Sequence, residues 1–151
     1  MKVAANYFDI YRKKGNLMSI NLAIMTQHNI SRIAVIILSI VMIVFGLYHF
    51  VKPTNLLVYV PDFMPGGIIW VYFVGTAFIL AAIAFITHKQ VKLAGYLLAL
   101  LLFIFVIAIH FPNYLNSGDN DMKQIAFTNM LKDTALAAFA LYLGSEASHL
   151  D

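Results

Sequence analysis

The sequence has no cysteine, and only 11% of its 151 residues are Asp, Glu, Lys or Arg. The missing cysteines exclude disulfides, thiolate metal sites and cysteine nucleophiles. A soluble domain of ordinary composition has about 25% charged residues. The low charge content, together with 62% apolar residues, therefore predicts a protein whose surroundings are membrane lipid. The formal net charge of +3 is too small and too dispersed to indicate a nucleic-acid partner.

Four apolar segments are long enough, at about 20 residues each, to cross the hydrocarbon layer as helices. They lie at about 33–51, 68–87, 93–111 and 125–144. Backbone groups find no water in hydrocarbon, so each span must be helical. The fourth is the least apolar, because Lys132 and Asp133 interrupt it. The sequence therefore predicts an all-α integral membrane protein, an antiparallel four-helix bundle over residues 32–146 with a short cytoplasmic tail at 147–151.

Residues 1–31 form a basic N-terminal extension outside this predicted bundle. Four aromatic and apolar residues near its start precede a cluster of basic residues. They are Tyr7, Phe8, Ile10 and Tyr11. Two interpretations fit this pattern: an interfacial helix on the anionic inner leaflet, or a flexible basic tail.

Lys and Arg are distributed unevenly between the two ends of the predicted bundle. The N-terminal segment carries five of them, and the second loop carries Lys89 and Lys92. The first and third loops hold only Lys52 and Lys123. Because cytoplasmic segments are enriched in Lys and Arg, both termini and the second loop are predicted to be cytoplasmic.

The third loop is predicted to begin at Pro112, because proline disrupts a continuing helix. Asp119 or Asp121 then suits the N-cap of the fourth helix. Small and polar side chains recur along one face of that helix and are predicted to face the bundle interior. They are Asn129, Asp133, Ala137, Ala140 and Gly144.

Five polar residues within the spans are the candidate site, and all lie toward the predicted outer side. They are His49, His110, Asn129, Lys132 and Asp133. Charge in hydrocarbon costs about 2.5–3.5 kcal/mol per residue at a helix centre, so such residues are retained for pairing or for function. One hypothesis is a pocket that binds a quinone-like headgroup, a small polar ligand or a proton. There His110 or His49 would donate to a carbonyl oxygen, with Asp133 as proton partner. The other is an internal salt bridge that fixes helix register.

No catalytic constellation and no metal-ligand set is recognisable, so we expect a protein that is not an enzyme. Two histidines at similar depth, His49 and His110, are the pattern expected of a haem b held by two axial imidazoles. Their level is near the outer edge and crowded with Leu and Phe, so we expect no haem. A quinone is the alternative to having no cofactor at all.

Four short motifs resemble those of the DoxX family of small bacterial four-helix membrane proteins. They are Arg32, residues 46–53 (GLYHFVKP), residues 110–113 (HFPN), and residues 129–133 (NMLKD) before an alanine-rich helix. The resemblance covers about residues 30–146 and implies a multi-pass protein of the bacterial inner membrane. The family is named for its association with thiosulfate:quinone oxidoreductase, and some relatives are linked to thiol redox systems. Without cysteine, any redox role here would pass through a quinone, a cofactor or a partner subunit.

Three functions follow from these observations. The small loops and the missing catalytic constellation favour a non-catalytic accessory subunit that binds other membrane protein subunits. The polar residues allow a quinone-linked redox component with its pocket in the outer half of the bundle. The same pocket would also serve a small transporter or ligand-binding protein, although no broken helix of the transporter kind is visible.

Overall fold

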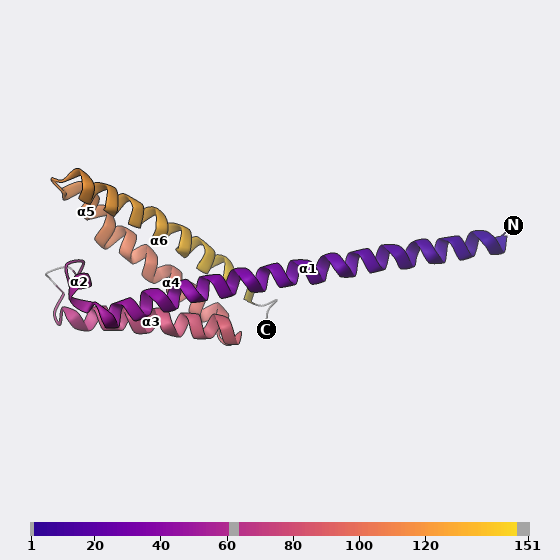
Figure 1. The fold of residues 1–151 in the computed structure, drawn as a ribbon, viewed down its shortest axis with the longest axis horizontal. Helices are drawn as coiled ribbons and strands as arrows, with labels where there is room; N and C mark the ends of the chain where they lie inside the picture. Colours follow the sequence, from indigo (N-terminus) through magenta and orange to yellow (C-terminus); the bar gives the residue numbers. More distant parts are fainter. Residues whose placement is uncertain (1, 61–63, 148–151) are drawn as a thin grey trace. The chain divides into compact units, whose positions relative to one another are not determined.

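The computed structural model describes residues 2–60 and 64–147, with side chains from residue 12 onward. Throughout these ranges the regular structure is helical (Figure 1). In chain order the elements are α1 (Lys2–Val51), α2 (Pro53–Leu57), α3 (Ile68–Thr87), α4 (Val91–Phe105), the π-helical turn η1 (Val106–His110), α5 (Phe111–Asn116) and α6 (Asn120–Glu146). Residues 148–151 of the predicted tail and the side chains of Tyr7, Phe8, Ile10 and Tyr11 lie outside the described residues.

The chain divides into two units, residues 1–37 and 38–151, and each is described by itself. In the first unit the described backbone is helical from Lys2, and the side chains from Arg12 to Ile33 are exposed. Nothing in this stretch stops a helix, because the first proline is Pro53 and a lone glycine such as Gly15 costs only about 1 kcal/mol. An interfacial position for this segment stays a prediction.

Three helical stretches are long and apolar enough to cross a membrane: Arg12–Val51, Ile68–Thr87 and Val91–Asn116. The chain is therefore a helical, multi-pass membrane protein. The second stretch is α3, whose bounds are those predicted from the sequence. Within the described ranges α6 is long enough but not apolar enough to be counted with them. Its first turns are polar, and charged residues interrupt it. A fourth span and the cytoplasmic position of both termini stay predictions.

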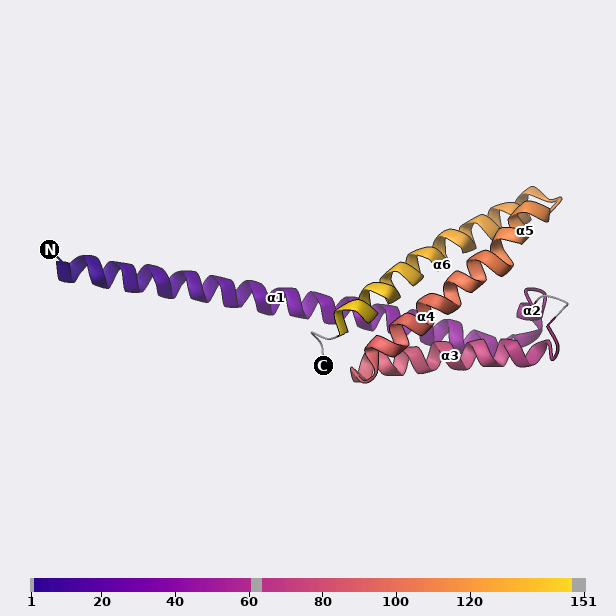
Figure 2. The same ribbon diagram turned by 180° about the vertical axis from the view of Figure 1, so that it is seen from behind.

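In the second unit the helices associate as two antiparallel pairs, α1 with α3 and α4 with α6 (Figures 1 and 2). A Cβ added at Gly46 of α1 would lie 2.9 Å from the carbonyl oxygen of Gly75 in α3. A Cβ added at Gly95 of α4 would lie 2.7 Å from the backbone nitrogen of Gly144 in α6. Small residues allow this close approach of helices in lipid, where the hydrophobic effect does not drive association.

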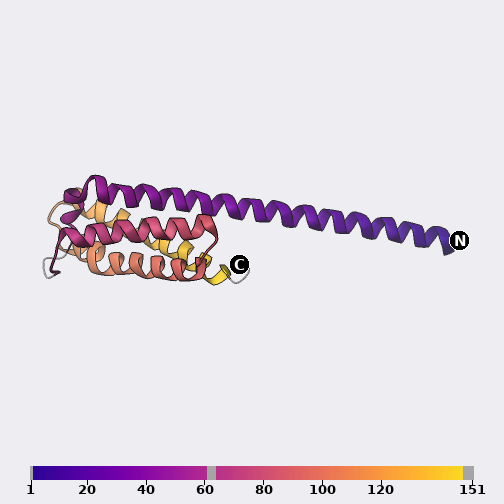
Figure 3. The ribbon, with the colours of Figure 1, turned by 90° about the horizontal axis from the view of Figure 1, so that it is seen from below.

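The two pairs run along a common direction (Figure 3) but diverge toward the end that carries α2 and α5 (Figures 1 and 2). The predicted inward face of α6 is confirmed for four of its five members. They are Asp133, Ala137, Ala140 and Gly144, all buried, whereas Asn129 is half-buried. The core of the second unit draws on all four long helices, since Met42 of α1, Phe85 of α3, Leu102 of α4 and Ala137 of α6 are almost fully buried.

The third helix differs from its prediction, because the helical backbone continues past Pro112 to Asn116. The loop predicted to begin at Pro112 was therefore wrong. The π turn η1 precedes the proline, and the Phe111 N–H bonds to the Val106 carbonyl five residues back. Proline has no N–H with which to continue the α-helical hydrogen bonds. Because the π turn has already shifted those hydrogen bonds, the helix can continue through Pro112. The predicted cap is confirmed at Asp119, whose side chain accepts from the Asp121 N–H at 3.0 Å.

Replacing Gly95 with alanine should destabilise the bundle, since its Cβ would lie 2.6 Å from the Ala140 carbonyl oxygen. That neighbour is backbone, so the two helices must move apart, and such overpacking costs about 1–3 kcal/mol. Gly118→Ala is the matched control, because nothing lies within 4 Å of its added Cβ. The free energy of unfolding in mild detergent measures both. Equal values for the two variants would contradict the close α4–α6 contact.

Candidate functional site

Four polar side chains from η1 and α6 form one hydrogen-bonded group, the polar cluster: His110, Asn129, Lys132 and Asp133. Asp133 is only 4% exposed. Its Oδ2 accepts from His110 Nε2 at 2.9 Å, and its Oδ1 lies 3.4 Å from Lys132 Nζ. Lys132 Nζ also donates to Asn129 Oδ1 at 3.2 Å. The buried carboxylate is thus paired on both oxygens, as burial of a charge requires.

The π turn directs His110 toward the bundle interior. In an uninterrupted α-helix, at about 100° per residue, His110 would lie about 80° around the axis from Leu102, which is almost completely buried. The π turn takes in one extra residue and so brings His110 to within about 20° of Leu102. His110 is correspondingly buried beside Asp133. The sequence offers no direct signal for this turn except the proline that follows it.

Lys132 turns inward, one of the two directions that its position on α6 allowed. Its side chain is 38% exposed, and its ammonium group lies 4.8 Å from the centre of the Phe45 ring on α1. Besides this cation–π contact it has Asn129 and Asp133 as polar neighbours. The Lys132 ammonium group therefore has three neighbours in the bundle: an amide oxygen, a carboxylate oxygen and an aromatic ring.

His49 lies beside the polar cluster without a hydrogen bond to it. Its Nδ1 donates to the Phe45 carbonyl of its own helix at 2.7 Å. Its ring meets Phe78 of α3 edge-on, with centroids 5.4 Å apart. The structure thus joins four of the five predicted residues directly, and the fifth lines the same cavity.

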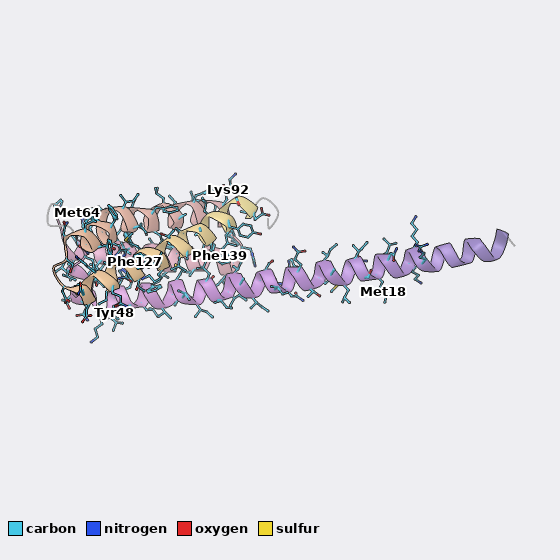
Figure 4. All side chains as sticks on the ribbon, turned by 90° about the horizontal axis from the view of Figure 1, so that it is seen from above. Met18, Tyr48, Met64, Lys92, Phe127 and Phe139 are labelled. Carbon is cyan, nitrogen blue, oxygen red and sulfur yellow. The ribbon has the colours of Figure 1, made fainter. Side chains whose placement is uncertain are left out.

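A cavity of about 690 Å³ adjoins the cluster, and all five predicted residues line it. Ligand pockets in proteins are typically about 300–1,000 Å³ and mostly apolar, with a few placed polar groups. Here the rest of the wall is chiefly aliphatic and aromatic. The aromatic members are Phe45, Tyr48, Tyr59, Trp70, Phe73, Phe78 and Phe105. The cavity lies where the helix pairs diverge; Tyr48 and Met64 mark that end and Lys92 the opposite end (Figure 4).

The connection between α2 and α3 and the first turn of α3 contribute aromatic side chains to the cavity wall. The sequence did not predict this role for them. The ring of Tyr59 lies 6.3 Å from that of His110 and lines the cavity. Trp70 lines it too, with its Nε1–H held by the Pro65 carbonyl at 2.8 Å. The signal in the sequence was the apolar character of this loop, of which residues 61–63 lie outside the described residues.

One family of proteins matches the part of the chain that contains this cavity. A family model described as a domain of unknown function (DUF8561) covers residues 38–143. No curated protein and no solved structure matches the chain. The comparisons thus assign no DoxX membership, and the resemblance to that family stays a prediction.

Asp133→Asn should lower the free energy of unfolding. The substitution removes the negative charge that pairs with Lys132 and that strengthens the hydrogen bond from His110 to the carboxylate. Losing a buried charge-assisted hydrogen bond costs about 1.5–3 kcal/mol. Asp121→Asn, at an exposed position in the first turn of α6, should change it by about 0.5 kcal/mol or less. Chemical unfolding in mild detergent measures both. His110→Phe should cost less in the Asp133→Asn background than alone; additive effects would contradict the His110–Asp133 contact.

Proposed function

The chain belongs to the family described as a domain of unknown function (DUF8561). Because that description assigns no activity, we propose the function from the candidate site. The protein binds a lipid-soluble molecule with a polar headgroup inside the membrane-spanning bundle. The observation that carries this proposal is the cavity of about 690 Å³ with a hydrogen-bonded polar cluster in an otherwise apolar wall.

The cavity separates this proposal from the hypothesis that the polar residues only fix helix register. A register-fixing group needs its hydrogen bonds satisfied and the space around it filled, since interiors are close-packed and voids cost stability. The contacts of Asp133 with His110 and Lys132 would serve register equally well without open volume beside them. The register hypothesis therefore explains the ion pairs and leaves the cavity unexplained.

The shape and chemistry of the wall favour a ligand with a flat polar ring and an apolar remainder. Phe45 and Phe78 contact each other with ring centres 6.3 Å apart, and Phe78 meets Phe105 edge-on at 6.4 Å. Aromatic walls of this kind suit a ring-shaped headgroup. The quinone class, suggested also by the resemblance to the DoxX family, fits both requirements. Redox chemistry would need an electron donor from another protein, so binding is the function proposed here.

We place the cavity on the outer side of a bacterial inner membrane, with α6 as the fourth span and both termini cytoplasmic. Lys89 lies between α3 and α4 and Lys92 in the first turn of α4, at the end opposite the cavity, and both support this orientation. The antiparallel contact of α6 with α4, from Gly144 beside Gly95 to Asp133 beside His110, supports a common depth for the two helices. In a bundle the inward position of Asp133 would keep its charge away from lipid.

The accessory-subunit and transporter hypotheses stay predictions. Neither the polar cluster nor the cavity identifies a partner chain, and neither indicates alternating access. Purification from the native membrane in gentle detergent distinguishes the three, because a subunit co-purifies with a stoichiometric partner. A transporter would move its substrate after reconstitution alone.

Filling the cavity should remove the bound molecule. Val74 lines the cavity and is 9% exposed, so Val74→Trp projects an indole into it; Val44 is 60% exposed on α1 and makes Val44→Trp the matched control. Mass spectrometry of organic extracts should find a lipid-soluble molecule, at about one per chain, with the wild type and the Val44→Trp protein. The Val74→Trp protein should have lost most of it.

A wild-type protein that carries no small molecule and takes up none of the quinone-class probes described below would contradict the proposed function. Equal retention by both tryptophan variants would place the bound molecule on the lipid-facing surface instead. In either case the polar cluster would return to a structural role.

A further inference from the structure

Lys132 Nζ and His110 Nε2 of the polar cluster both have protein acceptors, and among the described contacts only the Asn129 amide keeps N–H groups without one. Asn129, Asp133 and the Phe45 ring surround the Lys132 ammonium group. His110 Nε2 must carry its proton, because the Asp133 carboxylate oxygen that it faces at 2.9 Å only accepts. A carbonyl or phosphate oxygen entering the cavity therefore meets a lysine donor and an imidazole donor that are already engaged, and in the cluster only the neutral amide of Asn129 remains as a donor.

The charges of the cluster balance when both histidines are neutral. Lys132 compensates Asp133, and both carboxylate oxygens already have a partner. A second positive charge on His110 or His49 would lack a counter-charge inside the bundle, where an unpaired charge is costly. A neutral imidazole has one donor nitrogen and one acceptor nitrogen. In both rings one nitrogen faces a protein oxygen that can only accept, so that nitrogen carries the proton. The other ring nitrogen is therefore an acceptor.

The two acceptor nitrogens differ in position. His110 Nδ1 is enclosed and has no hydrogen-bond partner within the described residues. His49 uses Nδ1 to bind the Phe45 carbonyl, which holds the ring and assigns the lone pair to Nε2. Among the described residues nothing donates to His49 Nε2, and His49 forms part of the cavity wall. The acceptor that a ligand can use is therefore His49 Nε2.

We propose that His49 accepts a hydrogen bond from a hydroxyl group of the bound molecule, which makes that molecule a phenol or hydroquinone. The inference rests on the proposed function and specifies its ligand class. It reverses the expectation from the sequence that a histidine donates to a carbonyl oxygen, because the structure commits both donor nitrogens to protein acceptors. The remaining polar groups of the wall do not oppose this choice. Tyr48 and Tyr59 carry hydroxyls, and Asn55 and Asn129 carry amides; all four groups accept as well as donate.

Three probes that share one tail test the proposal with the full-length protein in mild detergent. They are 2-decylhydroquinone, its dimethyl ether, and 2-decyl-1,4-benzoquinone. The hydroquinone alone can donate. Competition between them, with the retained probe quantified by mass spectrometry, gives relative affinities. Trp70 is the single tryptophan and lines the cavity, so its fluorescence reports occupation of this site.

The wild type should bind the hydroquinone about tenfold more tightly than either other probe, the effect of one hydrogen bond. His49→Phe should remove this preference by weakening hydroquinone binding alone. His49→Gln should bind the hydroquinone and the benzoquinone equally, since an amide both donates and accepts. His28→Phe, at an exposed position of the first unit, should keep the wild-type preference.

Equal or tighter binding of the benzoquinone by the wild type would overturn this inference and leave the proposed function standing. A hydroquinone preference that survives in His49→Phe would also overturn it. If His49→Phe does not fold, the wild-type ranking of the three probes and the behaviour of His49→Gln decide the matter. Binding of none of the three would contradict the proposed function itself.

Discussion

The burial of one carboxylate governs the rest of this bundle. Asp133 is almost completely enclosed, and a lone charge there would cost several kcal/mol. Its two oxygens each need a partner. Lys132 turns inward to one of them, and η1 positions His110 beside the other. An ion pair of this kind contributes little net stability compared with apolar packing. Its effect is to fix the depth at which α4 and α6 meet and to make one part of the interior polar.

Packing makes the two ends of the second unit unequal. Gly95 and Gly144 bring the backbones of α4 and α6 together at one end, where no side chain larger than hydrogen fits between them. At the other end Phe45 and Phe78 face the opposite pair with bulky rings. Rings of fixed shape cannot close the wedge between two diverging helix pairs, so volume stays open beside the polar cluster. The cavity and the tight glycine contact are therefore two consequences of one splayed arrangement.

The sequence predicted the features that depend on local pattern. It placed both ends of α3 and the inward face of α6 around Asp133, because hydropathy and helical spacing determine them. It did not predict the direction of Lys132, which lies about 100° around the helix from Asp133 and depends on Phe45 of another helix. Nor could it predict the cavity, whose volume depends on how far the helix pairs separate. The family match over residues 38–143 falls within the second unit, and the first unit lies wholly outside it.

The π turn at Val106–His110 also bears on the history of the chain. Such a turn holds one residue more than a regular helix of the same length, which is what a single-codon insertion leaves when the helix absorbs it. Deleting one residue here would restore a regular α-helix ahead of Pro112 and keep the relative rotation of the residues on either side, because the π turn already absorbs the extra residue. We therefore expect family members to fall into two length classes at this point. Both classes would present the same position to the carboxylate, the shorter one from a regular α-helix.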